Sequence, residues 1–183
     1  MKVVSVNIGE RKSINWKGKI VETGIFKNPV NQPIFLGMED VEKDIVVDRR
    51  YHGGIEKAVY AYSENHYSYW KKLYPQLNWQ YGMFGENLTI SNLDETEIYV
   101  GSIYKLGEAT IEVTKPREPC YKLGIKFGTQ KVVKQFWNST KSGVYFKVLK
   151  TGNVEVGDEL KLVCVTEKPL SIADVYETKK DKL

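Results

Sequence analysis

The chain has 183 residues, of which 42% are hydrophobic and 27% charged, and its formal net charge is +4. These values are typical of one globular domain, or of one domain with a small appendage. The mild, interspersed charge argues against a nucleic-acid-binding protein, which needs a concentrated basic face, and no stretch approaches the roughly 20 apolar residues of a membrane span.

Short segments rich in β-branched or aromatic residues predict strands. Two hairpins are expected, one joining 102–106 to 110–113 across Gly107-Glu108, and one joining 143–149 to 158–165. Many short strands with frequent turns indicate a mainly β fold, a sandwich or a barrel. In chain order, the predicted strands are 3–6, 24–26, 44–47, 57–62, 87–90, 102–106, 110–113, 143–149 and 158–165.

Helical spacing predicts three short helices. The first begins with Ser63 as N-cap and ends before Pro75, the second covers 130–137, and the third covers 171–176. The polar end 177–183 is expected to be frayed. We therefore expect one β-rich domain over residues 1–167 and a short helical tail over 168–183.

The chain has two cysteines, Cys120 and Cys164, far apart in sequence. A disulfide framework is not expected, and residues 1–6 are too few for a signal peptide, so the expected location is cytoplasmic. Cys164 lies on the same face of its predicted strand as Leu160 and Leu162, and its side chain is expected to fill the core.

Cys120 closes the run Pro116-Arg117-Glu118-Pro119-Cys120, directly after a predicted strand. The two prolines stiffen this segment into an extended loop, and a neighbouring Arg117 would favour the thiolate, which serves as a nucleophile or as a soft metal ligand. An ordinary buried cysteine beside a proline turn is the alternative.

Two glycine-containing turns could supply a ligand site. His52-Gly53-Gly54 could present backbone amides to an anion, with His52 adding a proton or a hydrogen bond. Gly85-Glu86-Asn87 could direct a carboxylate and an amide toward a cleft, where they would recognise a heterocycle. Plain turn chemistry is the alternative for both turns.

Three segments, taken in series, resemble the MOSC domain, which is the C-terminal domain of molybdenum cofactor sulfurases. They are His52-Gly53-Gly54 with Lys57-Ala58-Val59, then 84–88, then 116–120. The resemblance covers roughly residues 3–165 and is strongest to the stand-alone YiiM-like branch. It implies a β-barrel, a pterin-based molybdenum cofactor (molybdopterin type) and, at family level, an association with pyridoxal phosphate.

The resemblance also implies roles for particular residues. Cys120 would be the protein ligand to molybdenum, and His52, Gly53, Gly54, Asn87 and Arg117 would help to hold the cofactor. Relatives of this type reduce N-hydroxylated compounds, such as hydroxylamino-purines and amidoximes. A reductase would take a small-molecule substrate and electrons from an external donor protein, with His52 as the proton donor, and would act as a monomer or homodimer.

Two other functions stay open. The chain could carry the cofactor, or sulfur on Cys120, to another protein without catalysis. It could also be a metal-free thiol enzyme with Cys120 as nucleophile and His52 as base. After the resembling region only 169–183 remains, shorter than the three-helix region usual in the YiiM-like branch.

Overall fold

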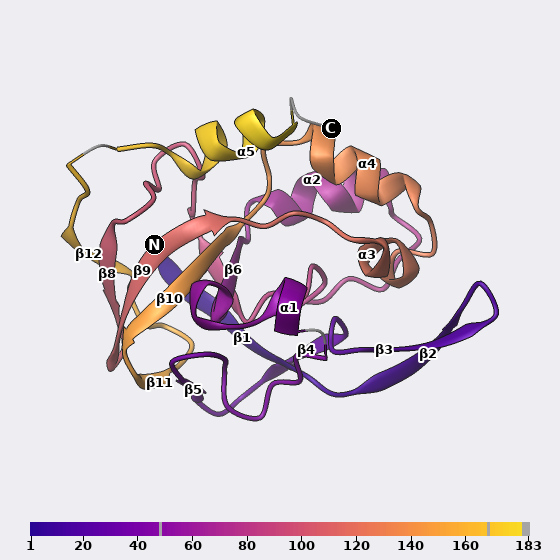
Figure 1. Cartoon of the computed structure of the whole chain (residues 1–183), viewed down its shortest axis with the longest axis horizontal. Coiled ribbons are helices and arrows are strands. Elements are labelled where there is room, and N and C mark those ends of the chain that lie inside the picture. The colour runs from indigo at the N-terminus through magenta and orange to yellow at the C-terminus, as the bar shows by residue number, and fades with distance from the viewer. Residues whose placement is uncertain (48, 168, 181–183) are drawn as a thin grey trace.

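The computed structural model describes residues 1–47, 49–167 and 169–180. One large sheet dominates it (Figure 1). Its strand order is β12-β8-β9-β10-β6-β7-β1-β4, and all neighbours are antiparallel except β6 and β7. The strands are β1 (Lys2–Gly9), β4 (Lys27–Val30), β6 (Val59–Ser63), β7 (Leu88–Ser91), β8 (Ile103–Leu106), β9 (Ala109–Pro116), β10 (Val144–Lys150) and β12 (Lys161–Cys164).

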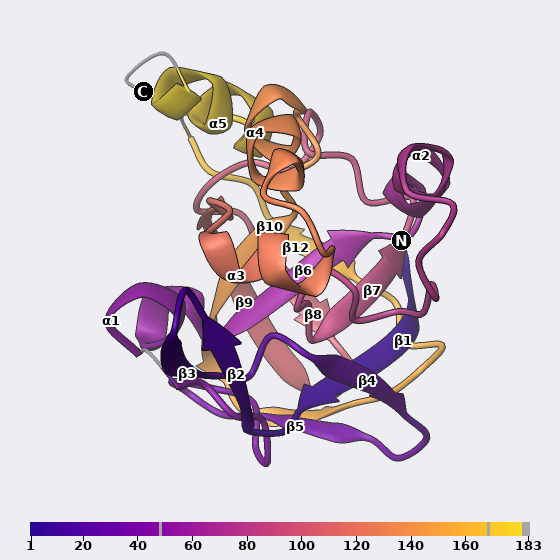
Figure 2. The same cartoon turned by 90° about the vertical axis from the view of Figure 1, so that its right-hand side faces the viewer.

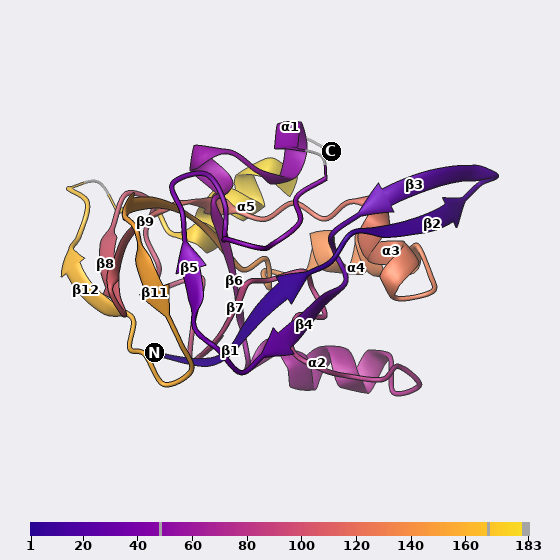
Figure 3. The same ribbon diagram turned by 90° about the horizontal axis from the view of Figure 1, so that it is seen from below.

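Two small sheets lie beside the large one. β2 (Lys12–Trp16) and β3 (Lys19–Thr23) form a hairpin that projects from the body, and β5 (Ile34–Leu36) pairs with β11 (Gly152–Val154) (Figure 3). The β2–β3 hairpin contacts α3, because Trp16 stacks on Tyr121 with ring centroids 5.8 Å apart.

The helices are short. They are α1 (Arg49–His52), a 3-10 turn η1 (Ile55–Lys57), α2 (His66–Leu73), α3 (Tyr121–Lys126), α4 (Lys131–Asn138) and α5 (Ile172–Lys180). Helices α4 and α5 lie together at one end of the molecule (Figure 2). No helix of the described residues is long and apolar enough to cross a membrane.

The described residues form two buried clusters. Mostly aliphatic side chains of the sheet form the first, around Val59, Ile111 and Val148. Aromatic side chains form the second, between β6 and the helices; there Tyr62 stacks on Phe84 with ring centroids 4.2 Å apart. Burial of these large side chains is the main source of stability.

The mainly β prediction is confirmed, but the closed barrel is not. The described strands form an open sheet with β12 and β4 at its edges. The segment before β12 does reach β1, through one isolated bridge between Lys2 and Glu159 and three backbone hydrogen bonds. The donors are the N–H groups of Val3, Gly157 and Leu160, and the acceptors are the carbonyls of Asp158, Val3 and Met1 respectively. These contacts do not extend into a paired strand.

Several predicted elements are confirmed. The first hairpin is present as β8 and β9. The second predicted helix is α4, and the third is α5, which continues through Lys180 where fraying was expected. Residues 181–183 lie outside the described residues.

The helix α2 begins later than predicted. Its N-cap is Asn65, while Ser63 is the last residue of β6 and pairs with Ile90 of β7. The sheet therefore holds Ser63 in extended backbone. The predicted end is confirmed, since α2 stops at Leu73. Tyr74, which precedes Pro75, has non-helical backbone (φ −132°, ψ 59°), as expected for a residue before proline.

The second predicted hairpin is wrong. β10 is paired on both sides, with β9 and β6, and has no free edge for β12. The chain therefore passes through β11 and returns to pair β12 with β8.

The strands predicted at 24–26 and 44–47 are also wrong, since neither segment is a strand. The two segments cross instead of joining the sheet. A Cβ on Gly24 would lie 1.8 Å from the Ile45 carbonyl oxygen, so glycine is required for this crossing. Cys164, expected in the core, is exposed because β12 is an edge strand with every residue exposed.

Candidate functional site

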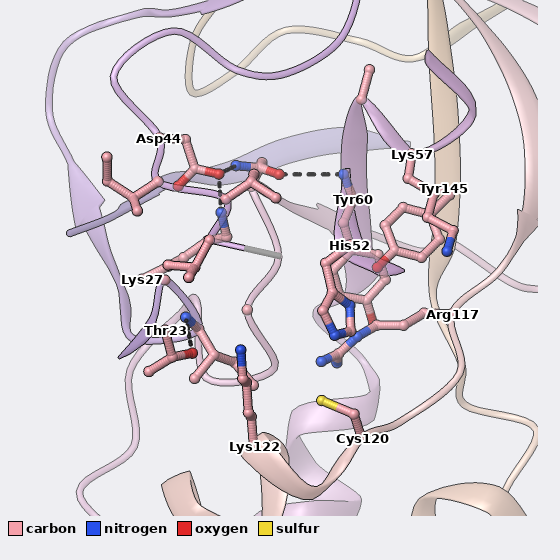
Figure 4. A pocket seen from close by; sticks show the side chains of 18 residues that line it. Thr23, Lys27, Asp44, His52, Lys57, Tyr60, Arg117, Cys120, Lys122 and Tyr145 are labelled. Carbon is pink, nitrogen blue, oxygen red and sulfur yellow. Dashed lines mark hydrogen bonds and ion pairs between the residues drawn. The ribbon is translucent and has the colours of Figure 1, made fainter. Parts of the chain in front are cut away.

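The crossing segments form one wall of a cavity, which we call the Asp44 cavity (Figure 4). Its empty volume is about 630 Å³, part of which opens to solvent. It is lined by Thr23, Gly24, Ile25, Lys27, Asp44, Ile45, Val46, Val47, His52, Lys57, Ala58, Tyr60, Gly85, Asn87, Arg117, Cys120, Lys122 and Tyr145.

Cys120 lies where β9 gives way to α3. Pro116 ends β9, Pro119 is buried, and Cys120 is the N-cap of α3 with extended backbone (φ −126°, ψ 169°). The stiff loop predicted from the prolines is therefore present. The Cys120 side chain is half-buried and its sulfur faces the cavity beside Arg117 and His52 (Figure 4).

Arg117 is buried, with 4% of its surface exposed. It donates a hydrogen bond of 2.6 Å to the Phe84 carbonyl, and its guanidinium lies over the Tyr60 ring at 5.0 Å. Burial lowers the pKa of Arg117, but the electrostatic influence of Tyr60, Tyr145 and Cys120 raises it more, so the net shift is upward. Arg117 is a fixed positive charge beside the thiol.

Asn87 lines the cavity, but its side chain is used within the protein. It donates to Asp44 at 3.0 Å and accepts from the Tyr60 N–H at 3.3 Å. Asp44 also accepts from the Gly9 N–H at 2.7 Å and from the Lys27 ammonium. Burial lowers the pKa of Lys27, which Asp44 partly offsets.

Sequence reasoning missed Lys27 and Asp44. The ion pair joins residues that belong to β4 and to the crossing segment, and both side chains are almost fully buried. Single charged residues in short segments carry no signal of such pairing, and only the tertiary structure brings them together.

His52 lines the cavity, as expected for a site residue, and it ends α1. Gly53 and Gly54 follow it but are not among the lining residues. A Cβ on Gly53 would lie 3.0 Å from Val46 Cγ1, and Gly54 has φ +86° as the cap of η1. Packing and turn geometry account for both glycines, and their contact with a ligand stays a prediction.

For Glu86 the turn-chemistry alternative is confirmed, because its carboxylate binds groups of its own turn and Glu86 is not among the residues that line the cavity. Glu86 is fully buried and accepts hydrogen bonds from the Gly82 N–H at 2.9 Å, the Phe84 N–H at 3.0 Å and the Thr89 hydroxyl at 3.1 Å. It holds the turn whose Phe84 carbonyl binds Arg117.

A second cavity meets the first at Cys120, and we call it the lysine cavity. Its empty volume is about 1100 Å³, part of which is open solvent. It is lined by His52, Lys57, Lys115, Pro116, Glu118, Pro119, Cys120, Tyr121, Lys122, Tyr145 and Lys179. Five of these residues, including Cys120 and His52, line both cavities.

The described side chains that line the Asp44 cavity could not hold a metal ion by themselves, but they suit a metal that is bound within a larger cofactor. Among the described residues, no cluster of three or more His, Cys, Asp or Glu could hold a metal ion. A half-buried thiol facing a cavity supplies one soft ligand, and Arg117 and Lys122 supply cations for a phosphate. These residues therefore fit a molybdenum–pterin group that would need one protein ligand to the metal and cations for its phosphate.

The MOSC domain model matches residues 48–161, and the chain belongs to the MOSC family. Its relatives place it in the stand-alone YiiM-like branch. The solved structure of YiiM from Geobacillus stearothermophilus superposes with a TM-score of 0.82 at 34% identity, covering 99% of this chain and 84% of that one.

Curated relatives agree with this placement. The chain is 38% identical to the uncharacterized protein YflK of Bacillus subtilis over 172 residues, 93% of this chain and 76% of that protein. It is 34% identical to protein YiiM of Escherichia coli and to a protein named reductase of Gibberella moniliformis, covering 77% and 80% of this chain respectively. It spans 64% of the Escherichia coli protein and 26% of the fungal reductase.

Proposed function

We propose that the chain is a molybdenum-dependent oxidoreductase that reduces N-hydroxylated compounds to amines. The observation that carries this proposal is the position of Cys120, whose thiol lies in the common wall of two cavities beside a buried arginine. One cavity can then hold the cofactor and the other the substrate, with the metal ligand between them. The name of the fungal relative supports a reductase.

Reduction of an N–OH group breaks the N–O bond, consumes two electrons and two protons, and releases the amine and water. The cofactor, when bound, supplies the two-electron redox chemistry. Cys120 would hold the metal, and Arg117 would place a fixed positive charge beside it, since the Phe84 carbonyl and two aromatic rings hold its guanidinium. His52 lines both cavities and is our candidate proton donor.

Electrons must come from outside the chain. The sequence has two cysteines, too few for an iron–sulfur cluster held by four. We propose an external electron-donor protein as the partner. Both cysteines are free thiols, which supports a reducing, cytoplasmic location.

The decisive experiment is purification from a host that makes the molybdenum cofactor, with measurement of molybdenum, pterin fluorescence and turnover of a hydroxylamino-purine with a chemical reductant. We expect molybdenum near one per chain in the wild type. Cys120→Ser should lose the metal and at least about 100-fold of the turnover, because the ligand is removed. Cys164→Ser is the matched control, since Cys164 is exposed on β12, and should keep both.

Other outcomes would contradict the proposal. Metal-free wild type whose turnover survives Cys120→Ser would rule out a molybdenum ligand. Cofactor-loaded protein that transfers its cofactor to an acceptor but reduces no N-hydroxylated compound would instead establish the carrier function.

A further inference from the structure

The two cavities that meet at Cys120 differ in the groups that line them. The Asp44 cavity contains deeply buried polar groups, with Lys27 6%, Asn87 4% and Arg117 4% exposed. The lysine cavity is lined by groups with accessible ends, since the side chains of Lys179 and Glu118 are 34% and 51% exposed. Buried, pre-paired groups suit a resident cofactor, and accessible groups suit a ligand that exchanges.

Positive charge dominates the lysine cavity. Among the lining residues that the structure describes, four lysines from four different elements face one acidic side chain: Lys57, Lys115, Lys122 and Lys179 against Glu118. Glu118 is already paired with Lys179. Burial lowers the pKa of Lys57, and Lys115 and Lys179 lower it further while Glu118 acts against them, so the three lysines are close enough to influence one another electrostatically. A bound anion would relieve the repulsion between these cations.

The rest of the lining suits a flat ring. Tyr121 is 39% exposed, and it is held by stacking with Trp16 at an interplanar angle of 28°. Pro116 and Pro119 add apolar surface next to it. A planar heterocycle could lie on these side chains with its polar end toward Cys120.

We propose that the lysine cavity is the substrate site and that it selects N-hydroxylated heterocycles carrying a phosphate monoester, a nucleotide rather than a free base or nucleoside. Lys115 and Lys179 are the specificity-determining residues. This inference rests on the proposed function for the reaction, but the phosphate site itself does not require the cofactor.

The first test uses the full chain from a host that cannot make the cofactor. Adenosine 5′-monophosphate, the amine product that such a substrate would give, is compared with adenosine. We expect the monophosphate to slow alkylation of Cys120 by iodoacetamide and adenosine at the same concentration to leave it unchanged. Peptide mass spectrometry reads Cys120 and Cys164 together, and exposed Cys164 is the internal reference. Calorimetry measures the same binding directly.

The variant Lys115→Ala/Lys179→Ala should weaken monophosphate binding roughly 10- to 100-fold, the usual effect of losing hydrogen bonds to a charged group. The matched control is Lys105→Ala/Lys161→Ala, which removes the same charge from exposed residues of β8 and β12. It should bind the monophosphate as the wild type does.

The second test uses the cofactor-loaded protein. KM for N6-hydroxyadenosine 5′-monophosphate should be roughly 10- to 100-fold below KM for the nucleoside, and the double variant should abolish that difference while keeping kcat. Loss of bound molybdenum in the double variant, with the KM ratio unchanged, would assign the lysines to the cofactor's phosphate and overturn the proposal.

The two proposals fail in different ways. If the wild type binds no monophosphate in the first test, the lysine cavity is not a phosphate site, whatever the reaction. If the monophosphate binds and protects Cys120 but no N-hydroxylated compound is reduced, the phosphate site stands and the reductase proposal fails.

Discussion

At the residue scale, two cations close in sequence to Cys120, Arg117 and Lys126, bind backbone carbonyl oxygens. Arg117 donates to the Phe84 carbonyl, and Lys126 of α3 donates to the carbonyls of Ile25 and Gly82. Both cations therefore hold the 82–86 turn against the loop that carries the thiol. Carbonyl oxygens of the turn accept hydrogen bonds from the two cations, and two of its backbone N–H groups donate to the Glu86 carboxylate.

The lowered pKa of Lys126 predicts that stability depends on pH. Burial lowers the pKa of Lys126 to about 7 from 10.5, with Arg117 and Lys27 acting in the same direction and Glu86 against it. Between these values the unfolded chain binds the proton and the folded chain does not, so the contribution to stability rises with pH from about 7 to about 10.5. Below pH 7 both states are protonated and the folded state bears the full cost of burying the charge.

We therefore expect the free energy of unfolding, measured by denaturant titration, to rise with pH over this window. Lys126→Met should flatten the rise by an amount on the order of a few kcal/mol. The slope is the readout, because the variant also leaves two carbonyls without their donor. Lys131→Met, at an exposed residue of α4, should keep the slope. Equal slopes in both variants would contradict the assignment.

At the element scale, the 82–86 turn is built around a carboxylate. Glu86 accepts from two backbone amides, from Thr89 and from the Tyr67 hydroxyl of α2. The same turn joins α2 to β7, and so the position of Asn87 in the Asp44 cavity depends on it. Gly85 has φ +79°, which favours glycine at this point of the turn.

Glu86→Gln tests this structural role. The substitution directs an amide donor against groups that are themselves donors, so we expect a loss of about 2–3 kcal/mol in the free energy of unfolding. Glu97→Gln, at an exposed residue, should change it by less than about 0.5 kcal/mol. Unchanged stability of Glu86→Gln together with weakened cofactor binding would instead make Glu86 a ligand-binding residue.

At the scale of the whole molecule, α5 is docked on the body. Tyr176 is fully buried, stacks on Trp137 with ring centroids 5.3 Å apart, and donates a hydrogen bond of 3.0 Å to the Phe136 carbonyl. Ile172 belongs to the aliphatic cluster of the sheet. The Ile172 N–H donates to the Ile98 carbonyl at 2.8 Å. Lys179 of the same helix lines the lysine cavity.

This docking makes a prediction about cooperativity. Tyr176→Phe should cost about 1 kcal/mol for one hydrogen bond, and Tyr176→Ala about 3–5 kcal/mol for the ring as well. Both costs should appear in the main unfolding transition, followed by circular dichroism in denaturant. Leu170→Ala, 51% exposed, is the control and should be near neutral. If the main transition is unchanged in Tyr176→Ala, residues 168–183 form a separate tail, as the division at 167/168 predicts.

Local patterns predicted a large part of the elements. Alternating β-branched residues located β1, β6, β7, β8 and β9, and the proline-stiffened run located the thiol loop. The strand predictions at 24–26 and 44–47 were wrong, because the apolar residues of these segments line a cavity wall instead of entering the sheet. The reason is that periodicity reports which side chains avoid water and not which surface covers them.

Strand pairing and the site's electrostatics depended on the tertiary structure. β12 pairs with β8 because β10 already has two neighbours, and no pattern within β12 contains that information. Three features of the site also depend on the folded chain. They are the Lys27–Asp44 ion pair, the burial of the Glu86 carboxylate in its turn, and the position of Cys120 in the lining of two cavities.

By itself, the sequence determined that the chain is mainly β, that Cys120 follows a stiff basic loop, and that three motifs in series are those of the MOSC family. These properties are local, because β-branched residues, prolines and glycines restrict the backbone wherever they stand. Only the tertiary structure decided which polar groups face the thiol and which are consumed in holding the fold. The reason is that burial and hydrogen bonding between residues distant in sequence determine the role of each polar group, and both arise only when the chain is folded.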